Sequence, residues 1–226
     1  MTQPCEIYRE RTYENQGFPE LIALVGTQPS LVLDIGCGAG ANLRLLKERG
    51  HTATGLTLSE TEARIVQAQG LSGQVWDITS ETLPFPSESF DALIFSHVLE
   101  HLAWPDLVLR RCCQLLKPTG KVYVALPNAM LFTQRWQFLL GRFRYTEEGI
   151  MDRTHLRFYD FRTARQLLEA AELEVEQHFG LGQFPMGPLR EWLPALSARV
   201  DRRVSKWCPG VFAIHLIVVG RFPAVE

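Results

Sequence analysis

Apolar residues recur along the chain with two different periods, and their alternation predicts a parallel α/β sheet. Continuous apolar runs of strand length occupy residues 31–36, 52–58 and 90–96. Between them, apolar residues fall three and four positions apart, as in the stretch that ends at Gly50, and this spacing is typical of amphipathic helices. Strands that alternate with helices form βα units, so the pattern predicts a sheet with helices packed against it.

The alternation of strand-like and helix-like patterns continues through the rest of the chain. Ser59 is the predicted N-cap of the helix after the second strand, and Glu62 is predicted to complete a capping box. The C-terminal run is too short to cross a membrane and is read as a buried strand. The remaining predicted elements are strands at 73–78, 121–128, 173–180 and 211–222 and helices at 41–50, 59–70 and 161–171, with a further helix that ends near 118.

Two stretches interrupt this rhythm. Residues 129–160 are aromatic and basic, and they are longer than a simple crossover requires, so we predict a lid insertion there. Residues 181–207 form a second predicted insertion of helical character, and residues 1–29 form an N-terminal cap segment. We therefore predict one domain over residues 1–226, a length that suits a single full core.

Composition and charge narrow the classes of function. The net charge of −2 and the pI near 6.3 give no electrostatic reason to expect a nucleic acid or an anionic membrane as partner. The first residues lack the apolar core of a secretory signal, and no apolar run reaches the roughly 18 residues of a spanning helix. Five cysteines, an odd number without C-x-x-C spacing, favour reduced thiols and a cytoplasmic location.

The stretch "LDIGCGAGAN" is the most informative motif. A buried strand leads into Gly36, Gly38 and Gly40 and then directly into a helix. Glycines are needed where the backbone turns sharply and where a ligand approaches main-chain atoms. A strand before the turn and a helix after it are the context that such a pattern requires, so the turn is a predicted ligand site.

The stretch "SHVLEH" contains His97, Glu100 and His101 in the H-x-x-E-H spacing of inverted zinc metallopeptidases. That mechanism needs both histidines on one long helix, but the buried strand ends immediately before His97. Pro105 then breaks any helix that starts there or begins a new one. The zinc hydrolase is therefore the least favoured interpretation, and we predict no metal ligands. Three roles remain open for this stretch: its residues shape a pocket wall, act as a base or, least favoured of the three, bind a divalent metal ion.

The motif "VLDIGCGAG" resembles the first motif of class I S-adenosylmethionine-dependent methyltransferases. The resemblance implies a doubly wound, mostly parallel seven-stranded sheet in the order 3-2-1-4-5-7-6. Asp34 would act on the cofactor ammonium and Asp77 on the adenine amino group. Thr57 stands where the family usually has an acid for the ribose hydroxyls, as in the similar "LTLS" of cyclopropane-fatty-acid synthases. The implied cofactor-binding residues are Asp34, Gly36, Cys37, Gly38, Gly40, Thr57, Leu58, Asp77, Ile78 and Ser96.

The predicted lid carries a second cluster of polar side chains. Its segments "PNAMLF", "FLLGRFRY" and "DRTHLRFYD" resemble methyltransferases from polysaccharide-biosynthesis clusters and the methionine-pathway W proteins. His155 is a further candidate base, and Arg153 and Arg157 could bind an anionic acceptor. In the N-terminal segment, Tyr8, Tyr13 and Phe18 could close over the cofactor or could pack as ordinary core residues.

These expectations combine into one function and its rivals. The cofactor is S-adenosylmethionine, and the acceptor is a small molecule, most plausibly an oxygen of a saccharide or a related biosynthetic intermediate. A hydroxyl acceptor benefits from a general base, for which His97, His101 and His155 are the candidates. Ubiquinone-pathway and small-RNA methyltransferases use a divalent ion near this position, but His97 here replaces their first glutamate. The alternative is a cofactor-binding regulatory partner without turnover. The apolar residues of the two insertions could serve either as a lid or as a homodimer contact.

Overall fold

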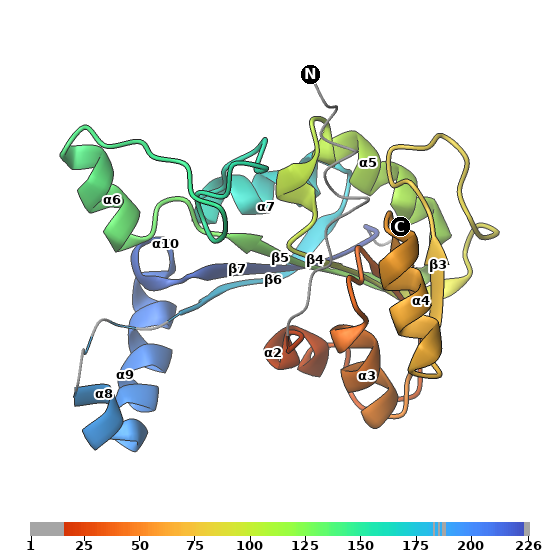
Figure 1. Ribbon diagram of the computed structural model, residues 1–226, viewed down its shortest axis with the longest axis horizontal. Helices are drawn as coiled ribbons and strands as arrows, with labels where there is room; N and C mark the ends of the chain where they lie inside the picture. The colour runs from red at the N-terminus through yellow and green to blue at the C-terminus, as the bar shows by residue number, and fades with distance from the viewer. Residues whose placement is uncertain (1–15, 183, 185, 187–188, 224–226) are drawn as a thin grey trace.

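The computed structural model describes residues 16–182, 184, 186 and 189–223. Its strands are β1 Leu31–Ile35, β2 Thr52–Thr57, β3 Ser72–Val75, β4 Phe90–Ser96, β5 Leu116–Pro127, β6 Glu174–Leu181 and β7 His215–Arg221. They form one sheet in the order β3-β2-β1-β4-β5-β7-β6 (Figure 1). Strand β7 is antiparallel to both of its neighbours, and the other pairs are parallel. The fold class and strand order implied by the resemblance are thus confirmed.

Helices cover both faces of this sheet. The α-helices are α2 Pro19–Ala23, α3 Ala41–Glu48, α4 Glu60–Ala68, α5 Pro105–Cys112, α6 Phe132–Leu139, α7 Phe161–Ala170, α8 Leu189–Trp192, α9 Pro194–Trp207 and α10 Pro209–Phe212, and the 3₁₀ turns are η1 Leu99–His101 and η2 Cys113–Leu115. Helices α5 and α7 lie on one face, and α2, α3 and α4 lie on the other (Figure 1). Each face has its own buried apolar cluster.

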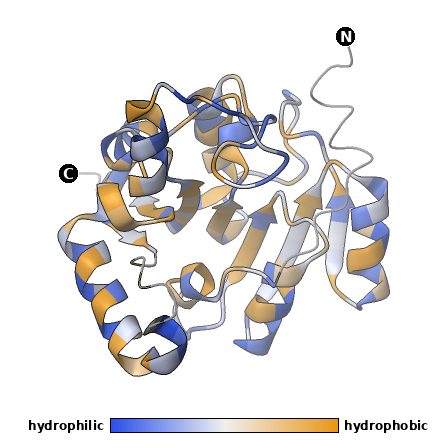
Figure 2. Ribbon diagram, turned by 60° about the vertical axis from the view of Figure 1, so that its left-hand side comes forward, coloured by the Kyte–Doolittle hydropathy of each residue, from blue (hydrophilic) through white to orange (hydrophobic). Residues whose placement is uncertain are grey.

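The middle of the sheet is the core of the molecule. Strand β4 is buried over residues 92–95, and the second half of β5 is buried over residues 122–127. Side chains on both faces of these strands meet helices, which explains why their sequences are continuous apolar runs rather than alternating ones. Figure 2 shows hydrophobic residues concentrated on these strands and on the helix surfaces that face them. A rigid centre of this kind holds the loops at the strand ends in place.

The third strand ends earlier than predicted. It stops at Val75 and not at residue 78, because its partner β2 ends at Thr57 and later residues have no neighbouring strand to pair with. The capping box predicted for Ser59 and Glu62 is also only half present. The Ser59 side chain accepts from the Glu62 N–H, but the Glu62 carboxylate bonds to the Thr57 hydroxyl instead.

Two other boundaries differ from the prediction. Helix α5 ends at Cys112, and β5 already begins at Leu116, because Leu116 pairs with Phe90 across a register irregularity in β4. The last strand covers only His215–Arg221, because Pro209 at a helix start opens the short α10 instead of continuing an extended run. Apolar character alone could not separate these short helical turns from strand.

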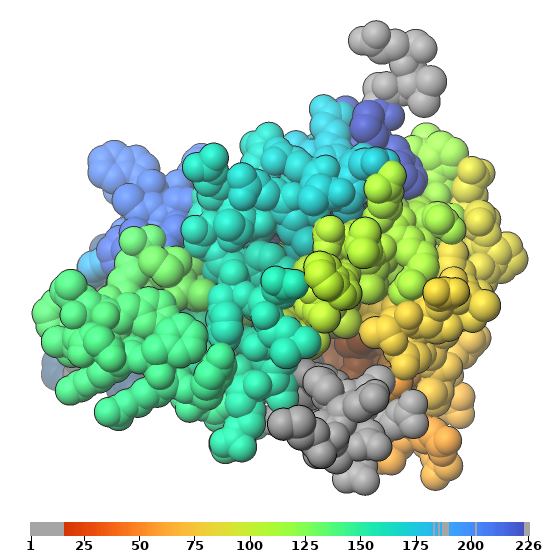
Figure 3. All heavy atoms as spheres, turned by 90° about the horizontal axis from the view of Figure 1, so that it is seen from above, coloured from red at the N-terminus to blue at the C-terminus, as the bar shows by residue number. Residues whose placement is uncertain are grey.

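The two predicted insertions lie at the ends of the strands. Residues 129–160 contain α6 and a long loop whose ends are brought together by a bridge between Asn128 and Tyr159. In the view of Figure 3 this segment lies against the residues that follow β4. Residues 181–207 include α8 and α9. Within the described ranges, no helix has the length and apolar character needed to cross a membrane.

Candidate functional site

The turn after β1 enters the left-handed backbone region three times. Gly36, Gly38 and Gly40 have φ angles of 79°, 52° and 87°, which strain a residue that carries a Cβ. At Gly36 the space is closed as well, because a Cβ there would lie 2.3 Å from Cγ2 of Val98. The first glycine is therefore required by packing: it lets the residues after β4 sit directly on the end of β1.

Asp34 lies in β1 immediately before this turn. Its side chain is 0% exposed, and neither carboxylate oxygen has a hydrogen-bond partner in the described part of the chain. Burial raises the pKa of Asp34 to about 7, and the nearby Asn42 side chain only partly opposes the rise. A buried carboxylate without partners is costly. The position therefore fits a ligand that brings a cationic N–H donor, such as the ammonium of an amino acid.

The Cys37 side chain packs into the core. A Cβ added to Gly55 in β2 would lie 2.5 Å from Cys37 Sγ, and Cys37 shares a buried cluster with Leu43 and Val66. Burial raises the pKa of the Cys37 thiol, so the thiol stays protonated. The Cys37 N–H already donates to the Leu56 carbonyl at 2.9 Å. A contact between Cys37 and a cofactor would accordingly have to come from the remaining main-chain atoms.

Thr57, at the end of β2, is paired with a carboxylate that sequence analysis assigned to another role. The Thr57 hydroxyl donates to Oε2 of Glu62, and the Ser59 N–H donates to the Thr57 hydroxyl oxygen at 3.1 Å. Glu62 is buried at the start of α4, and Leu58 between these groups is half-buried. An acid therefore does stand at the end of β2. It was missed because it comes from the next helix and not from the strand.

Asp77 and Ile78 lie just beyond β3, at the same sheet edge as Thr57. Asp77 Oδ1 accepts from the Thr79 N–H at 2.8 Å and from the Thr79 hydroxyl at 2.6 Å. The Ile78 carbonyl accepts from Arg111 at 2.6 Å. These bonds fix the turn next to the end of β2, which is where the resemblance expects the adenine contacts.

His97 follows Ser96, the half-buried last residue of β4, and takes an unusual backbone conformation. Its φ is +57°, and its N–H donates to the Ala125 carbonyl of β5 at 3.0 Å. The ring of Phe18 stacks on the His97 ring at a centroid distance of 6.0 Å. Phe18 therefore lies over a predicted catalytic residue, whereas Tyr8 and Tyr13 are outside the described residues.

Both ring nitrogens of His97 are engaged. Nδ1 lies 3.3 Å from Oε1 of Glu100, and Nε2 lies 3.0 Å from Nδ1 of His215. His215 is the first residue of β7, and sequence analysis did not select it. It lies 118 positions from His97, so no local pattern could have connected them. Glu100, His97 and His215 form a row that we call the relay.

The charges of the relay follow from its surroundings. Burial alone would raise the pKa of Glu100, but the hydrogen bond and charge of His97 hold it below the usual value. An ionised Glu100 only accepts, so His97 Nδ1 carries the proton and His97 Nε2 accepts from His215 Nδ1. The lone pair of the relay then lies on His215 Nε2. Burial also lowers the pKa of His215 to about 4, which keeps this ring neutral.

His101 and His155 meet on the other side of Glu100. Their ring centroids are 4.8 Å apart. Ligand atoms of Glu100, His101 and His155 all lie within 4.8 Å of one another, and Oε2 of Glu100 is buried without a hydrogen bond. Burial lowers the pKa of His101, so its ring is neutral. These three residues, and not His97, could hold a divalent cation.

The arginines predicted to bind an anionic acceptor have other partners. Arg153 forms an ion pair with Glu147. Arg157 donates to the Ala103 carbonyl through Nε at 3.1 Å and through a terminal nitrogen at 2.5 Å. Its guanidinium also lies 5.8 Å from the centroid of Trp104. Both side chains therefore fasten the loop at residues 149–160 to its surroundings.

The H-x-x-E-H spacing does not form a zinc-peptidase site. His97 precedes the 3₁₀ turn Leu99–His101, and Pro105 opens a separate helix. His97 and His101 therefore do not lie on one helix, and they turn to different partners.

Comparisons with known proteins identify the family of the chain. Residues 8–178 match the methyltransferase domain family, and the chain belongs to that family, whose cofactor is S-adenosylmethionine. A ubiquinone biosynthesis O-methyltransferase from Pseudomonas fluorescens is 33% identical over 117 residues, which are 48% of this chain and 50% of the relative. The chain thus spans about half the length of the curated relatives it matches.

Solved structures share the fold at lower identity. An S-adenosylmethionine-dependent methyltransferase from Archaeoglobus fulgidus has a TM-score of 0.60 and 20% identity, over 90% of this chain and 94% of that one. A 1,6-didemethyltoxoflavin-N1-methyltransferase from Burkholderia thailandensis, with S-adenosylhomocysteine bound, has a TM-score of 0.57 and 16% identity over 91% and 76% of the two chains. This neighbour is named for a nitrogen acceptor, so the fold alone does not fix the acceptor atom.

Proposed function

We propose that the protein transfers the methyl group of S-adenosylmethionine to an oxygen of a small molecule. The observation that carries this proposal is the relay of Glu100, His97 and His215, which stands where β4 and β5 end and β7 begins. A hydroxyl must lose a proton as it is methylated, and a histidine held by a carboxylate is suited to take it. The O-methyltransferases among the curated relatives support the same acceptor atom.

Each part of the site has a role in this proposal. Asp34 receives the cofactor ammonium, and the glycine turn leaves room for the cofactor's amino-acid end. Glu62 and Thr57 offer oxygen atoms to the ribose, and Asp77 and Ile78 offer contacts to adenine. S-adenosylmethionine supplies a methyl group on a sulfonium, which is already activated for displacement. The protein's main task is then to align the acceptor and remove its proton.

The relay can take that proton while the imidazole ring beside the acceptor stays neutral, because the added positive charge ends on His97. His215 Nε2 takes the proton of the acceptor hydroxyl while the proton on His215 Nδ1 passes to His97 Nε2. His97 becomes an imidazolium beside the ionised Glu100, which stabilises the new charge. The relay thus assigns the direct contact to His215 and makes His97 the positioning residue. His101 and His155 remain candidates for the base as predicted, and their cluster around Glu100 supports a cation-assisted variant of the same reaction.

The finer identity of the acceptor is part of the proposal. The "DRTHLRFYD" loop, with its resemblance to methyltransferases of polysaccharide clusters, supports a saccharide or a related intermediate. The regulatory partner of the W type remains the rival reading. A cytoplasmic location rests on the cysteines, of which the four in described positions are free. A homodimer is supported by exposed apolar side chains such as Trp192 and Trp207.

A turnover assay distinguishes an enzyme from a cofactor-binding regulatory partner. Purified protein is incubated with S-adenosylmethionine and a panel of hydroxylated acceptors, and S-adenosylhomocysteine is quantified. We expect acceptor-dependent product, with turnover reduced about 100-fold in His215→Ala and in His97→Ala. His178→Ala is the matched control because His178 stacks on Phe161, outside the relay. S-adenosylhomocysteine binding, measured by calorimetry, should stay unchanged in all three variants. Tight cofactor binding with no product from any acceptor would favour the regulatory partner.

A further inference from the structure

Arg142 and Arg144 differ from the other arginines of the predicted lid. Arg135 donates to the Met130 carbonyl at 2.6 Å, and Arg153 and Arg157 are held as described above. Among the described residues, neither the Arg142 nor the Arg144 side chain has a hydrogen bond or an ion pair. Both belong to residues 129–145, which contain three arginines and no acidic residue, although the whole chain has a net charge of −2. The segment thus concentrates positive charge that the protein itself does not neutralise.

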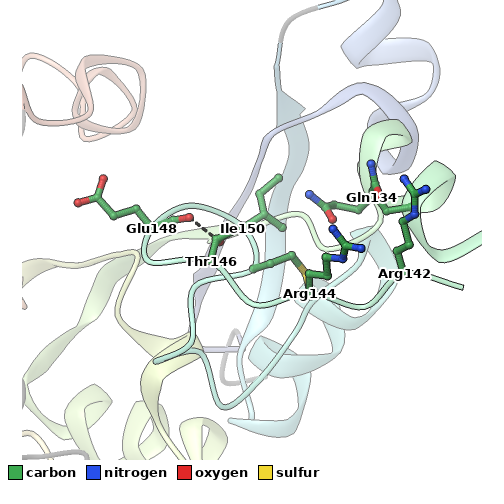
Figure 4. A pocket seen from close by; sticks show the side chains of 8 residues that line it. Gln134, Arg142, Arg144, Thr146, Glu148 and Ile150 are labelled. Carbon is green, nitrogen blue, oxygen red and sulfur yellow. Dashed lines mark hydrogen bonds between the residues drawn. The ribbon is translucent and has the colours of Figure 1, made fainter. Parts of the chain in front are cut away.

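The two arginines line one recess. Its volume is about 390 Å³, and the residues that line it include Gln134 and Gln137 from α6. The guanidinium groups and the glutamine NH₂ groups are all donors. Figure 4 shows Arg142 and Arg144 on the same side of the recess as Gln134, whereas the Glu148 carboxylate points away from them. Glu148 and Thr146 also line the recess, but the two guanidinium groups outnumber its one carboxylate, and this excess of charged donors favours a ligand rich in acceptor oxygens.

The charge and size of the recess select the ligand further. Two guanidinium charges match a phosphate monoester, which carries about −1.5 to −2 near neutral pH and three terminal oxygens. Arginine is suited to such a group because its planar donors engage two oxygens at once. A volume of about 390 Å³ is far larger than a phosphate ion and falls within the roughly 300–1,000 Å³ of small-molecule sites. The recess therefore fits a phosphate together with part of the molecule that bears it.

The recess is connected to the histidine cluster. Ile150 lines it, and the Ile150 carbonyl lies 3.0 Å from Nδ1 of His155. Phe143, between the two arginines, packs edge-on against Phe158 at 6.0 Å, and Phe158 contacts the His155 ring at 6.2 Å. The recess thus adjoins the segment that carries His155, one of the candidate bases.

We propose that Arg142 and Arg144, assisted by the amides of Gln134 and Gln137, bind a phosphate monoester group of the methyl acceptor. This inference rests on the proposed function, because it names the class of acceptor for that site. The phosphate can belong to a soluble ester or to a lipid headgroup, since both present the same oxygens. The exposed rings of Phe143 and Tyr145 could pack against the part of either molecule that carries the phosphate.

Direct binding tests the subsite without any need for turnover. Phenyl phosphate is titrated into the full chain by calorimetry, with inorganic phosphate as competitor, for the natural protein and for R142Q/R144Q. We expect binding that inorganic phosphate displaces and that weakens at least about tenfold in the double variant, because charge-assisted hydrogen bonds are lost. Q134A/Q137A should weaken binding a few-fold at unchanged net charge. A second arm measures sedimentation with phosphatidylcholine vesicles with and without phosphatidic acid, and arginine-dependent sedimentation identifies a lipid phosphate.

The control variant removes the same charge elsewhere. R49Q/R64Q alters two exposed arginines around α3 and α4, which lie far from α6 in Figure 1. Equal loss of phenyl phosphate binding in this control would show non-specific attraction and overturn the proposal. The proposal is also overturned if R142Q/R144Q binds phenyl phosphate and vesicles as well as the natural protein does. It is overturned as well if the natural protein binds neither. S-adenosylhomocysteine is titrated in parallel: its failure to bind would remove the proposed function and leave the phosphate result standing.

Discussion

Asp34 keeps a carboxyl group where neither solvent nor protein completes its hydrogen bonds. With its pKa raised from 3.8 to about 7, the free protein holds a proton there under mildly acidic conditions. A bound ammonium favours the ionised form, so cofactor binding must release that proton. We expect the affinity for S-adenosylhomocysteine to fall about tenfold for each pH unit below 7 and to level off above it. Calorimetry in buffers of different ionisation enthalpy measures the affinity and the number of protons released on binding. An affinity that does not change with pH would contradict the role of Asp34.

Asp34→Asn tests the same carboxylate in the free protein. Because folding raises the pKa of Asp34, the contribution of this group to stability is greatest below its unfolded pKa and is lost as the pH rises through about 7. The amide has no charge to bury. We therefore expect the variant to gain stability well above pH 7, by ~4 kcal/mol at most, and to lose cofactor binding. Urea unfolding against pH measures the gain. Glu81→Gln, an exposed carboxylate, should change neither property.

Gly36 has two reasons to be glycine, and a double-mutant cycle separates them. Gly36→Ala places a Cβ in the left-handed region and also against Val98, so we expect a loss of about 2–3 kcal/mol in the free energy of unfolding. In a Val98→Ala background the clash is relieved and only the backbone strain remains, which leaves a cost of about 1 kcal/mol. Urea unfolding of the natural protein, the two single variants and the double variant gives the coupling free energy between residues 36 and 98. Costs that are simply additive would show that Val98 does not close the turn.

At the scale of elements, the loop at residues 149–160 is fastened to the loop after β4. The Glu100 carbonyl accepts the N–H groups of Leu156 and Arg157 at 2.8 and 3.0 Å. His101 Nδ1 lies 3.3 Å from the Thr154 carbonyl. These main-chain contacts fix both rings of the histidine cluster. The Nδ1 atoms of His101 and His155 both lie within hydrogen-bonding distance of main-chain carbonyls, and contacts of this kind orient imidazole rings that bind a metal.

This arrangement leads us to expect cation binding, although sequence analysis predicted no metal ligands. Two imidazoles and a carboxylate suit Zn²⁺ or Mn²⁺. At a metal concentration of roughly 100 times Kd, binding adds ~2.7 kcal/mol to stability, which corresponds to a rise in Tm of about 5–10 °C. We expect this rise in the natural protein and not in His155→Ala. His178→Ala should keep the rise. A metal-induced shift that persists without His155 would place the ion elsewhere.

At the scale of the whole molecule, local features were predictable and distant contacts were not. The strands, the glycine turn and Asp34 could be recognised because a few adjacent residues determine them. Glu62 was visible but was assigned to a helix cap, since its bond to Thr57 depends on how α4 approaches the end of β2. His215 could not be found, because it meets His97 only after β7 inserts beside β5. The absence of a hydrogen bond or ion pair at the Arg142 side chain among the described residues likewise depends on the tertiary structure, and no local pattern predicts it.

Glu100 connects the relay to the cluster of His101 and His155 and to the loop at residues 149–160. Oε1 of its carboxylate lies 3.3 Å from His97 Nδ1, the carboxylate also belongs to the cluster with His101 and His155, and its main-chain carbonyl accepts from the N–H groups of Leu156 and Arg157. By thermodynamic reciprocity, a cation held by Glu100, His101 and His155 would weaken the attraction of Glu100 for the relay, and positive charge on the relay would weaken cation binding by the same factor.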